Sequence, residues 1–324
     1  MREETPGIEA DAPTPVVVVT GPTASGKTEL AISLAVRLGG EIVNGDAMQV
    51  YRGLDIGTAT PSAAQRARVA HHLFDLWDIT HAASAADYQR EARAVIRDIW
   101  SRGRVPLLVG GSPLYLRTVC DRLEIPPRDP RLRRELDERA RREGPAGLHD
   151  ELRALDPAAA EAIDPRNVRR VVRALEVVRL TGSFQARMPE PRPWRPTLWL
   201  GIDAARDVLD ERIERRSRQM WSGGLLAETA ELLDAGLAAA PTAAGAVGYR
   251  QAMSVLAGER TPAEGLADTI RATRRLARRQ QRTLRGDPRI QWVTAPGEVE
   301  QALDILRGAR LSAAGGSTPS PAEH

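Results

Sequence analysis

One stretch limits the possible folds of this chain more than any other, and it reads Gly21-Pro22-Thr23-Ala24-Ser25-Gly26-Lys27-Thr28. It follows the β-branched run Val16–Val19 and leads into a helical pattern, so the strand, loop and helix that a phosphate-binding loop requires are all present. Glycines let the backbone curl until N–H groups face a phosphate, and the helix N-terminus adds its positive dipole end. We therefore expect all eight residues to bind phosphate.

Lys27 is the only lysine in the chain, because all its other Lys-or-Arg positions are arginine. At this position a compact ammonium group suits a phosphate better than a planar guanidinium does. A lysine in a chain that otherwise uses arginine therefore indicates that Lys27 is chemically required. The hydroxyl of Thr28 is the expected protein ligand of Mg²⁺, the expected cofactor. The alternative is a glycine-rich turn without a ligand.

The composition excludes several classes of protein. No stretch reaches membrane-spanning length, and the acidic N-terminus lacks the order of a signal peptide, so we expect a cytoplasmic protein that does not bind membranes. The single cysteine, Cys120, excludes an internal disulfide and a multi-cysteine metal site, and a buried position suits it. The adjacent His71 and His72 lack partners at metal-ligand spacing, which favours structural hydrogen bonds.

The pattern of elements predicts an α/β fold of the P-loop NTPase-like type, in which helices flank a parallel sheet. Apolar strands at 105–109 and 199–203 resemble the first strand, and the former also ends in glycines and a hydroxyl. Residues 126–196 are rich in Arg and Glu and show no strand pattern, which predicts an inserted all-helical subdomain. The expected catalytic core comprises 15–125 and 197–310, with disordered tails at 1–14 and 311–324.

Asp46 comes just after the predicted strand 41–44. Ligands of parallel sheets bind beyond the carboxyl ends of the strands, so Asp46 is expected to face the bound phosphates. The position alone fits equally well an Asp that caps a helix or bonds within its loop.

Arginines gather in the insert and on the predicted helix Ile270–Arg285. On that helix Ile270, Thr273, Ala277, Gln280 and Leu284 form one stripe, and five arginines at 271, 275, 278, 282 and 285 form another. The arginine stripe spans about 21 Å at 1.5 Å per residue, and its five arginines are expected to be unpaired. Such a stripe favours a polyanion, and nucleic acid is the expected partner.

Over residues 15–307 the chain resembles the tRNA dimethylallyltransferases. The phosphate loop is shared with other families, and the resemblance depends on an ordered set of further motifs. These are Asp46 with Gln49 and Tyr51, Asp-Ile-Gly-Thr-Ala (55–59), Val-Gly-Gly-Ser (109–112) with Leu114-Tyr115, Arg-Ala-Leu-Glu (173–176), Val-Gly-Tyr-Arg-Gln (247–251) and Thr-Arg-Arg-Leu-Ala-Arg-Arg-Gln (273–280).

The resemblance implies transfer of a dimethylallyl group from dimethylallyl diphosphate, held by the phosphate loop, to N6 of adenosine 37, beside the anticodon, in tRNAs that read codons beginning with U. It implies a monomer that binds the anticodon stem-loop, with Lys27, Asp46 as general base, Ser112 as its support and Arg216 on the diphosphate. The residues expected to contact tRNA are Asp46, Ala47, Met48, Gln49 (on the adenine), Ser112, Arg133, Arg169, Arg170, Arg173, Val247, Gly248, Tyr249, Arg250, Arg271, Arg275, Arg278 and Arg282.

Three positions depart from the family pattern: Ala47 replaces the usual Ser, Pro113 a frequent Gly, and Thr283 a frequent Trp. Two other functions also fit part of the chain. A small-molecule or nucleoside kinase would use the same loop on ATP and Asp46 as the base for a hydroxyl, but leaves the basic helix unexplained. A nucleotide-gated RNA-binding module would leave Asp46, Ser112 and Gln49 without a role.

Overall fold

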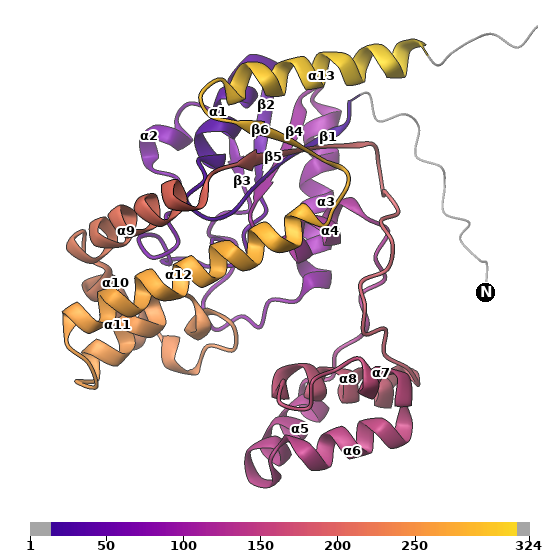
Figure 1. Ribbon diagram of the computed structural model, residues 1–324, viewed down its shortest axis with the longest axis vertical. Coiled ribbons are helices and arrows are strands. Elements are labelled where there is room, and N and C mark those ends of the chain that lie inside the picture. Colours follow the sequence, from indigo (N-terminus) through magenta and orange to yellow (C-terminus); the bar gives the residue numbers. More distant parts are fainter. Residues whose placement is uncertain (1–13, 316–324) are drawn as a thin grey trace, which may run out of the picture. The chain divides into compact units, whose positions relative to one another are not determined.

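The computed structural model describes residues 14–315, which divide into two compact units (Figure 1). Unit 1 comprises 14–121 and 193–315, and unit 2 comprises 122–192, so both junctions lie four residues before those expected. Most of the expected tails lie outside the described residues. Residues 311–315, expected to be disordered, continue the last helix.

Unit 1 is built on a six-stranded sheet in which every neighbouring pair is parallel, which confirms the expected fold class. The strand order is β3-β2-β4-β1-β5-β6, so β1 lies centrally between β4 and β5. The strands are β1 (Val16–Thr20), β2 (Gly40–Asn44), β3 (His71–His72), β4 (Val105–Gly110), β5 (Thr197–Asp203) and β6 (Ile290–Thr294). The sequence reading missed β6, an edge strand that is exposed along part of its length.

Helices cover both faces of the sheet because the central strands are apolar on both sides. Val17 and Val19 pack with residues of α1 and α13, whereas Val16 and Val18 belong to the core formed with α3, α4, α11 and α12. The helices before the insert are α1 (Lys27–Leu38), α2 (Ala63–Arg66), α3 (Ala85–Ser101) and α4 (Pro113–Cys120).

The helices after β5 lie on different faces of the sheet: α13 packs with α1, whereas α9 and α12 lie side by side (Figure 1). They are α9 (Arg206–Ser222), α10 (Leu225–Asp234), α11 (Tyr249–Leu256), α12 (Pro262–Arg285) and α13 (Glu298–Gly315), with short 3-10 turns η1 (Leu237–Ala239) and η2 (Ala243–Gly245). The helix expected at 270 begins eight residues earlier, because Thr261 and Glu264 form a capping box around its first turn.

Unit 2 is entirely helical over its described elements and has a core of its own. Its helices are α5 (Pro130–Glu143), α6 (Pro145–Leu155), α7 (Pro157–Glu161) and α8 (Val168–Thr181). The first three begin with proline, which suits the first turn of a helix because its missing N–H needs no partner there. Leu136, Leu148, Leu152 and Leu175 are fully buried in its core.

The residues singled out by composition have structural roles. Cys120 is buried and free. His71 Nδ1 bonds to the carbonyl of Val69 at 2.9 Å, and His72 Nε2 bonds to the Glu41 carboxylate at 2.7 Å. Between residues 14 and 315 no helix is long and apolar enough to cross a membrane.

Candidate active site

The phosphate loop joins the central strand β1 to α1. Gly21 has φ 148°, and a Cβ there would lie 2.9 Å from Ser25 Oγ and 3.2 Å from the carbonyl oxygen of Ile202. A side chain at this position would therefore clash with the loop and with β5. Gly26, with φ 102°, adopts the left-handed conformation that directs the chain into α1.

Lys27 folds back onto its own loop. Its Nζ donates to the carbonyl oxygen of Pro22 at 2.8 Å. Loss of water around the ammonium lowers the pKa of Lys27 to about 8, although the Asp46 carboxylate opposes this shift and the Arg216 guanidinium adds to it. The three charges therefore lie close enough together to act on one another.

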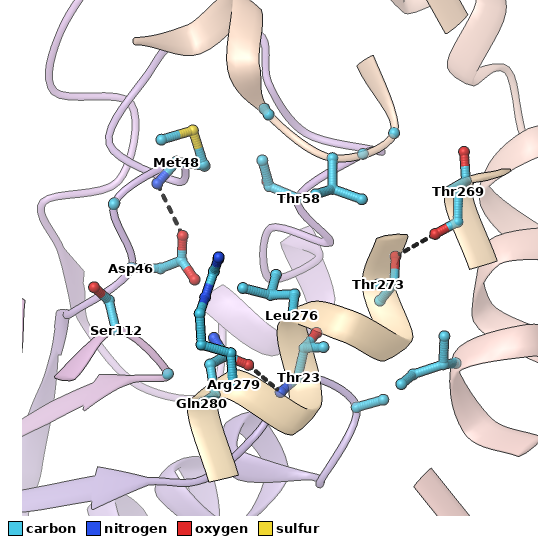
Figure 2. A pocket seen from close by; sticks show the side chains of 18 of the residues that line it. Thr23, Asp46, Met48, Thr58, Ser112, Thr269, Thr273, Leu276, Arg279 and Gln280 are labelled. Atoms are coloured by element: carbon cyan, nitrogen blue, oxygen red, sulfur yellow. Dashed lines mark hydrogen bonds between the residues drawn. The ribbon is translucent and has the colours of Figure 1, made fainter. Parts of the chain in front are cut away.

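Asp46 and Ser112 follow the neighbouring strands β2 and β4 and reach one cavity (Figure 2). The Asn44 side chain accepts the Asp46 N–H at 2.8 Å, and Asp46 Oδ1 accepts the Met48 N–H at 2.8 Å. The loop hydrogen bond foreseen as an alternative role for Asp46 is thus present, yet it uses only one oxygen. Ser112 precedes α4 without capping it through its side chain, which leaves the hydroxyl to the cavity.

The cavity has a volume of about 510 Å³, enough for a prenyl diphosphate or a base. Its wall combines the phosphate loop, the turns after β2 and β4, the 57–58 loop, and the facing sides of α9 and α12. The described residues that line it include Thr23, Asp46, Met48, Thr58, Ser112, Arg216, Met220, Val247, Gly248, Thr273, Leu276, Arg279 and Gln280. Both polar and apolar groups are therefore available to a ligand.

Two arginines of α9 face the loop, one turn apart. Arg216 donates to the carbonyl oxygen of Thr58 at 3.2 Å, and its burial lowers its pKa while Asp46 opposes the change. Arg212 donates to the carbonyl oxygen of Ser25 at 3.2 Å. The expected role of Arg216 on the diphosphate stays a prediction, and Arg212 is the arginine that bonds directly to the phosphate loop.

The IPP transferase family model matches residues 49–287. The chain belongs to the IPP transferase family. A tRNA dimethylallyltransferase of Salinispora tropica is 54% identical and covers 91% of this chain and 93% of its own length. The tRNA isopentenylpyrophosphate transferase of Bacillus halodurans has a solved structure that is 38% identical, with a TM-score of 0.66 over 91% of this chain and 95% of that one. A eukaryotic dimethylallyltransferase acting on tRNA shares the fold, with a TM-score of 0.77.

Gln49 and Tyr249 are among the residues that the family resemblance assigned to tRNA but that do not line the cavity. Gln49 Nε2 donates to the carbonyl oxygens of Thr58 and Ala59 at 3.1 and 3.3 Å, so its amide holds a loop of the wall. Tyr249 is fully buried, and its hydroxyl lies 2.5 Å from the Glu228 carboxylate. The expectation that Tyr249 contacts tRNA is therefore wrong for its side chain. Arg250 is exposed, away from the cavity lining.

The arginines of unit 2 are less available than expected. Arg133 and Arg173 both pair with the buried Glu176, at 3.7 and 2.8 Å. Arg170 donates to the carbonyl of Ala186, whereas Arg169 is exposed. One buried carboxylate therefore serves two of the arginines that were expected to contact tRNA.

The stripe on α12 is likewise not unpaired. Arg271 pairs with Asp268 at 3.1 Å, Arg278 with Asp210 at 3.2 Å and Arg285 with Asp203 at 3.0 Å. Among the described residues Arg275 and Arg282 form no ion pair, and both are exposed. These two carry the charge that remains for a polyanion.

The sequence reading missed the inward side of α12. Thr273, Leu276, Arg279 and Gln280 all line the cavity. Thr273 and Gln280 belong to the stripe predicted with Ile270, Ala277 and Leu284, and two polar residues in that otherwise apolar stripe are the signal in the sequence. Ala47, Pro113 and Thr283, the three departures from the family pattern, also line the cavity.

The residues beside the loop fit Mg²⁺ bound mainly through a substrate. Among the described residues no group of three His, Cys, Asp or Glu side chains could hold a metal. Thr28 lies in the first turn of α1, directly after Lys27. Mg²⁺ prefers oxygen ligands, keeps several waters and often takes the rest of its shell from substrate phosphates, so one hydroxyl suffices.

Proposed function

We propose that this protein transfers the dimethylallyl group of dimethylallyl diphosphate to N6 of adenosine 37, beside the anticodon, in tRNAs that read codons beginning with U. The observation that carries the proposal is one cavity bordered by a phosphate loop and by Asp46 with Ser112. The names of the relatives support the same reaction.

The diphosphate belongs at the loop, where its charge meets the Lys27 ammonium, the Arg216 guanidinium and the positive end of α1. Lys27 would exchange the Pro22 carbonyl oxygen, now 2.8 Å away, for a phosphate oxygen. Mg²⁺, held by Thr28 and the phosphates, would supply further charge to stabilise the leaving group. The apolar side chains of Met220 and Leu276 suit the five-carbon group.

The transfer forms one bond and breaks another. The lone pair of N6 attacks C1 of the dimethylallyl group, and the C1–O bond breaks with its electron pair leaving on the diphosphate. The N6 proton goes to Asp46, through the carboxylate oxygen that Met48 does not bind. An allylic carbon tolerates positive charge, so the protein acts mainly by stabilising the diphosphate.

The adenine must leave the stacked anticodon loop to reach Asp46, at a cost of about a few kcal/mol. Arginine contacts to the RNA backbone would offset this cost. Exposed Arg250, Arg275 and Arg282 in unit 1 and Arg169 in unit 2 are candidates that make no ion pair among the described residues. The protein would act as a monomer in the cytoplasm.

A kinase would use the same loop, and nothing in the comparisons favours it. The products distinguish the two reactions, because a kinase converts ATP to ADP whereas the transferase releases intact diphosphate. The test incubates the protein with unmodified tRNA, dimethylallyl diphosphate and Mg²⁺, without ATP. We expect diphosphate release that needs both substrates and a five-carbon mass increase on adenosine. ATP hydrolysis without prenylated nucleoside would contradict the proposal.

A further inference from the structure

The Gln280 side chain of α12 reaches the phosphate loop, although the two lie far apart in the sequence. The Thr23 N–H donates to Gln280 Oε1 at 2.9 Å, across 257 residues of sequence (Figure 2). Only the amide oxygen can accept this hydrogen bond, so the orientation of the amide is fixed. The amide nitrogen then points to the turn that precedes Ser112.

That turn is shaped to admit the amide. A Cβ on Gly111 would lie 2.8 Å from Gln280 Nε2 and 3.1 Å from the carbonyl oxygen of Gly21. The amide therefore sits between the ends of β1 and β4, in space that any side chain at position 111 would take. One residue of α12 thus contacts both glycine turns of the cavity.

The hydrogen bonds at Pro22 and Thr23 belong to one peptide unit. Lys27 Nζ holds its carbonyl oxygen at 2.8 Å, and Gln280 Oε1 holds its N–H at 2.9 Å. The two groups of a trans peptide point in opposite directions, so this pair of contacts fixes the orientation of the peptide plane. The Pro22 carbonyl oxygen also accepts the Ser25 N–H, at 3.3 Å, within the loop. When Lys27 moves to a phosphate, Gln280 remains as the contact that holds this peptide from outside the loop.

We infer that Gln280 is a positioning residue, which holds the Pro22–Thr23 peptide while Lys27 binds the diphosphate. The inference extends the proposed function, since the diphosphate is that of the proposed substrate. Gln280 keeps the loop at a fixed separation from the Ser112 turn, and so sets the distance between the leaving group and the acceptor site. Without the Gln280 hydrogen bond the loop would be less ordered, so binding of the diphosphate would cost additional conformational entropy.

The test measures binding of inorganic diphosphate with Mg²⁺, a probe that requires no prenyl transfer. Gln280→Leu keeps a similar volume but cannot accept the Thr23 N–H, so we expect the dissociation constant for diphosphate to rise about tenfold. In turnover the KM for dimethylallyl diphosphate should rise as well. The affinity for an anticodon stem-loop RNA should change less than about twofold, which a general loss of folding would not allow.

Gln281→Leu is the matched control. It makes the same change one residue along α12, where the amide donates only to the Ala204 carbonyl at 3.4 Å and lies outside the cavity lining. Gly111→Ala tests the contact from the other turn, because its methyl group would displace the amide. Combined with Gln280→Leu, its effect on diphosphate binding should be less than additive, since both changes remove the Gln280 contact and only Gly111→Ala also presses on the Gly21 carbonyl oxygen.

Equal diphosphate affinity in Gln280→Leu and Gln281→Leu would overturn the inference, and so would additive losses in the double variant. These results do not depend on prenyl transfer. A wild-type protein that binds diphosphate but prenylates no tRNA would contradict the proposed function and leave the result for Gln280 standing.

Discussion

The charge of Lys27 depends on pH within the working range of an enzyme. Burial lowers the pKa of its ammonium from 10.5 to about 8, so the free protein loses this positive charge as the pH rises through 8. The proton is present below pH 8, where the loop can bind an anion. A bound diphosphate would in turn favour the charged form and raise the pKa.

The first prediction is that kcat/KM for dimethylallyl diphosphate falls above about pH 8, because this constant reports the protonation of the free enzyme. Lys27→Arg should be less active overall, since a planar guanidinium fits the loop poorly, but its high-pH decline should disappear. Lys27→Ala should weaken diphosphate binding at every pH and leave RNA affinity little changed. Steady-state rates between pH 6 and 9.5 would check this. If kcat/KM of Lys27→Arg fell in the same way above pH 8, the decline would belong to a titrating group other than Lys27.

Asp46→Asn is the second prediction at this scale. The amide oxygen can still accept the Met48 N–H, now 2.8 Å from Oδ1, so the loop should keep its shape. Removing a negative charge beside the loop should leave diphosphate binding intact or tighter. Transfer should slow by about 10²–10⁴-fold for want of a base. Single-turnover rates with saturating tRNA measure this step, and a wild-type rate would exclude Asp46 as the base.

Residues within one short motif could be predicted from the sequence, whereas those that meet only in the fold could not. The loop from Gly21 to Thr28 carries its own spacing, and Asp46 follows a recognisable strand. Gln280 meets Thr23 across 257 residues, and no local pattern indicates that contact. Glu228 supports the 56–57 backbone in the same way, from α10.

At the scale of elements, the packing of α9 against α12 decides which arginines are free. Asp210 and Glu214 on α9 pair with Arg274 and Arg278 on α12, over a sequence separation of at least 60 residues. The helical period on its own displays the arginines of α12, but most of their acidic partners come from other elements, Asp210 from α9 and Asp203 from β5. The sequence therefore predicted the stripe correctly and its net charge wrongly.

We therefore expect Arg275→Ala and Arg282→Ala to weaken binding of an anticodon stem-loop RNA, and each to reduce the slope of log K against log salt by about one unit. Arg278→Ala is the matched control, because its guanidinium already pairs with Asp210 at 3.2 Å. Its slope should change less. Titrations at several salt concentrations would check this, and equal slopes for the three variants would contradict the assignment.

The loop that supplies Gly57 and Thr58 to the cavity is held from α10 and α11. The Ile56 N–H donates to Glu228 at 2.9 Å, and the Gly57 N–H donates to the Tyr249 hydroxyl at 3.1 Å. A Cβ on Gly57 would lie 2.4 Å from the Tyr249 ring. The buried tyrosine thus serves as a support for the cavity wall.

Gly57→Ala should lower the free energy of unfolding by about 1–3 kcal/mol, the usual cost of overpacking a rigid core. It should also raise the KM for dimethylallyl diphosphate, because Thr58, the partner of Arg216, is displaced. Gly147→Ala is the control: a Cβ there meets no atom within 4 Å, and the residue lies inside α6. That change should stabilise the protein slightly. Thermal unfolding of both variants distinguishes them.

At the scale of the whole molecule, the insert leaves and re-enters unit 1 at adjacent points. Asp121 and Pro193 form an antiparallel bridge, and the Trp194 N–H donates to the Cys120 carbonyl oxygen at 2.7 Å. Asp121 is almost fully buried, paired with Arg117 at 2.7 Å and with Arg289 at 2.5 Å. The junction is therefore anchored within unit 1 itself.

The last prediction follows from this junction and from the separate core of unit 2. Replacing residues 122–192 by a short Gly-Ser linker should leave unit 1 folded, because adjacent ends need only a tight turn and the ion pairs of Asp121 stay in place. Residues 122–192 alone should also fold, with the low stability of a small domain. Circular dichroism and thermal unfolding of both fragments would check this.

Diphosphate binding should depend on unit 1 alone, whereas RNA binding should depend on both units. Shortened unit 1 keeps the loop, Asp46 and Arg216, so it should bind diphosphate as the full chain does. It should bind the anticodon stem-loop more weakly and with a smaller salt slope, since it lacks exposed Arg169 and its neighbours. Asp121→Ala in the full chain should destabilise unit 1, because two partly buried guanidinium groups lose a partner. If shortened unit 1 bound RNA as tightly as the full chain, the insert would have no part in tRNA recognition.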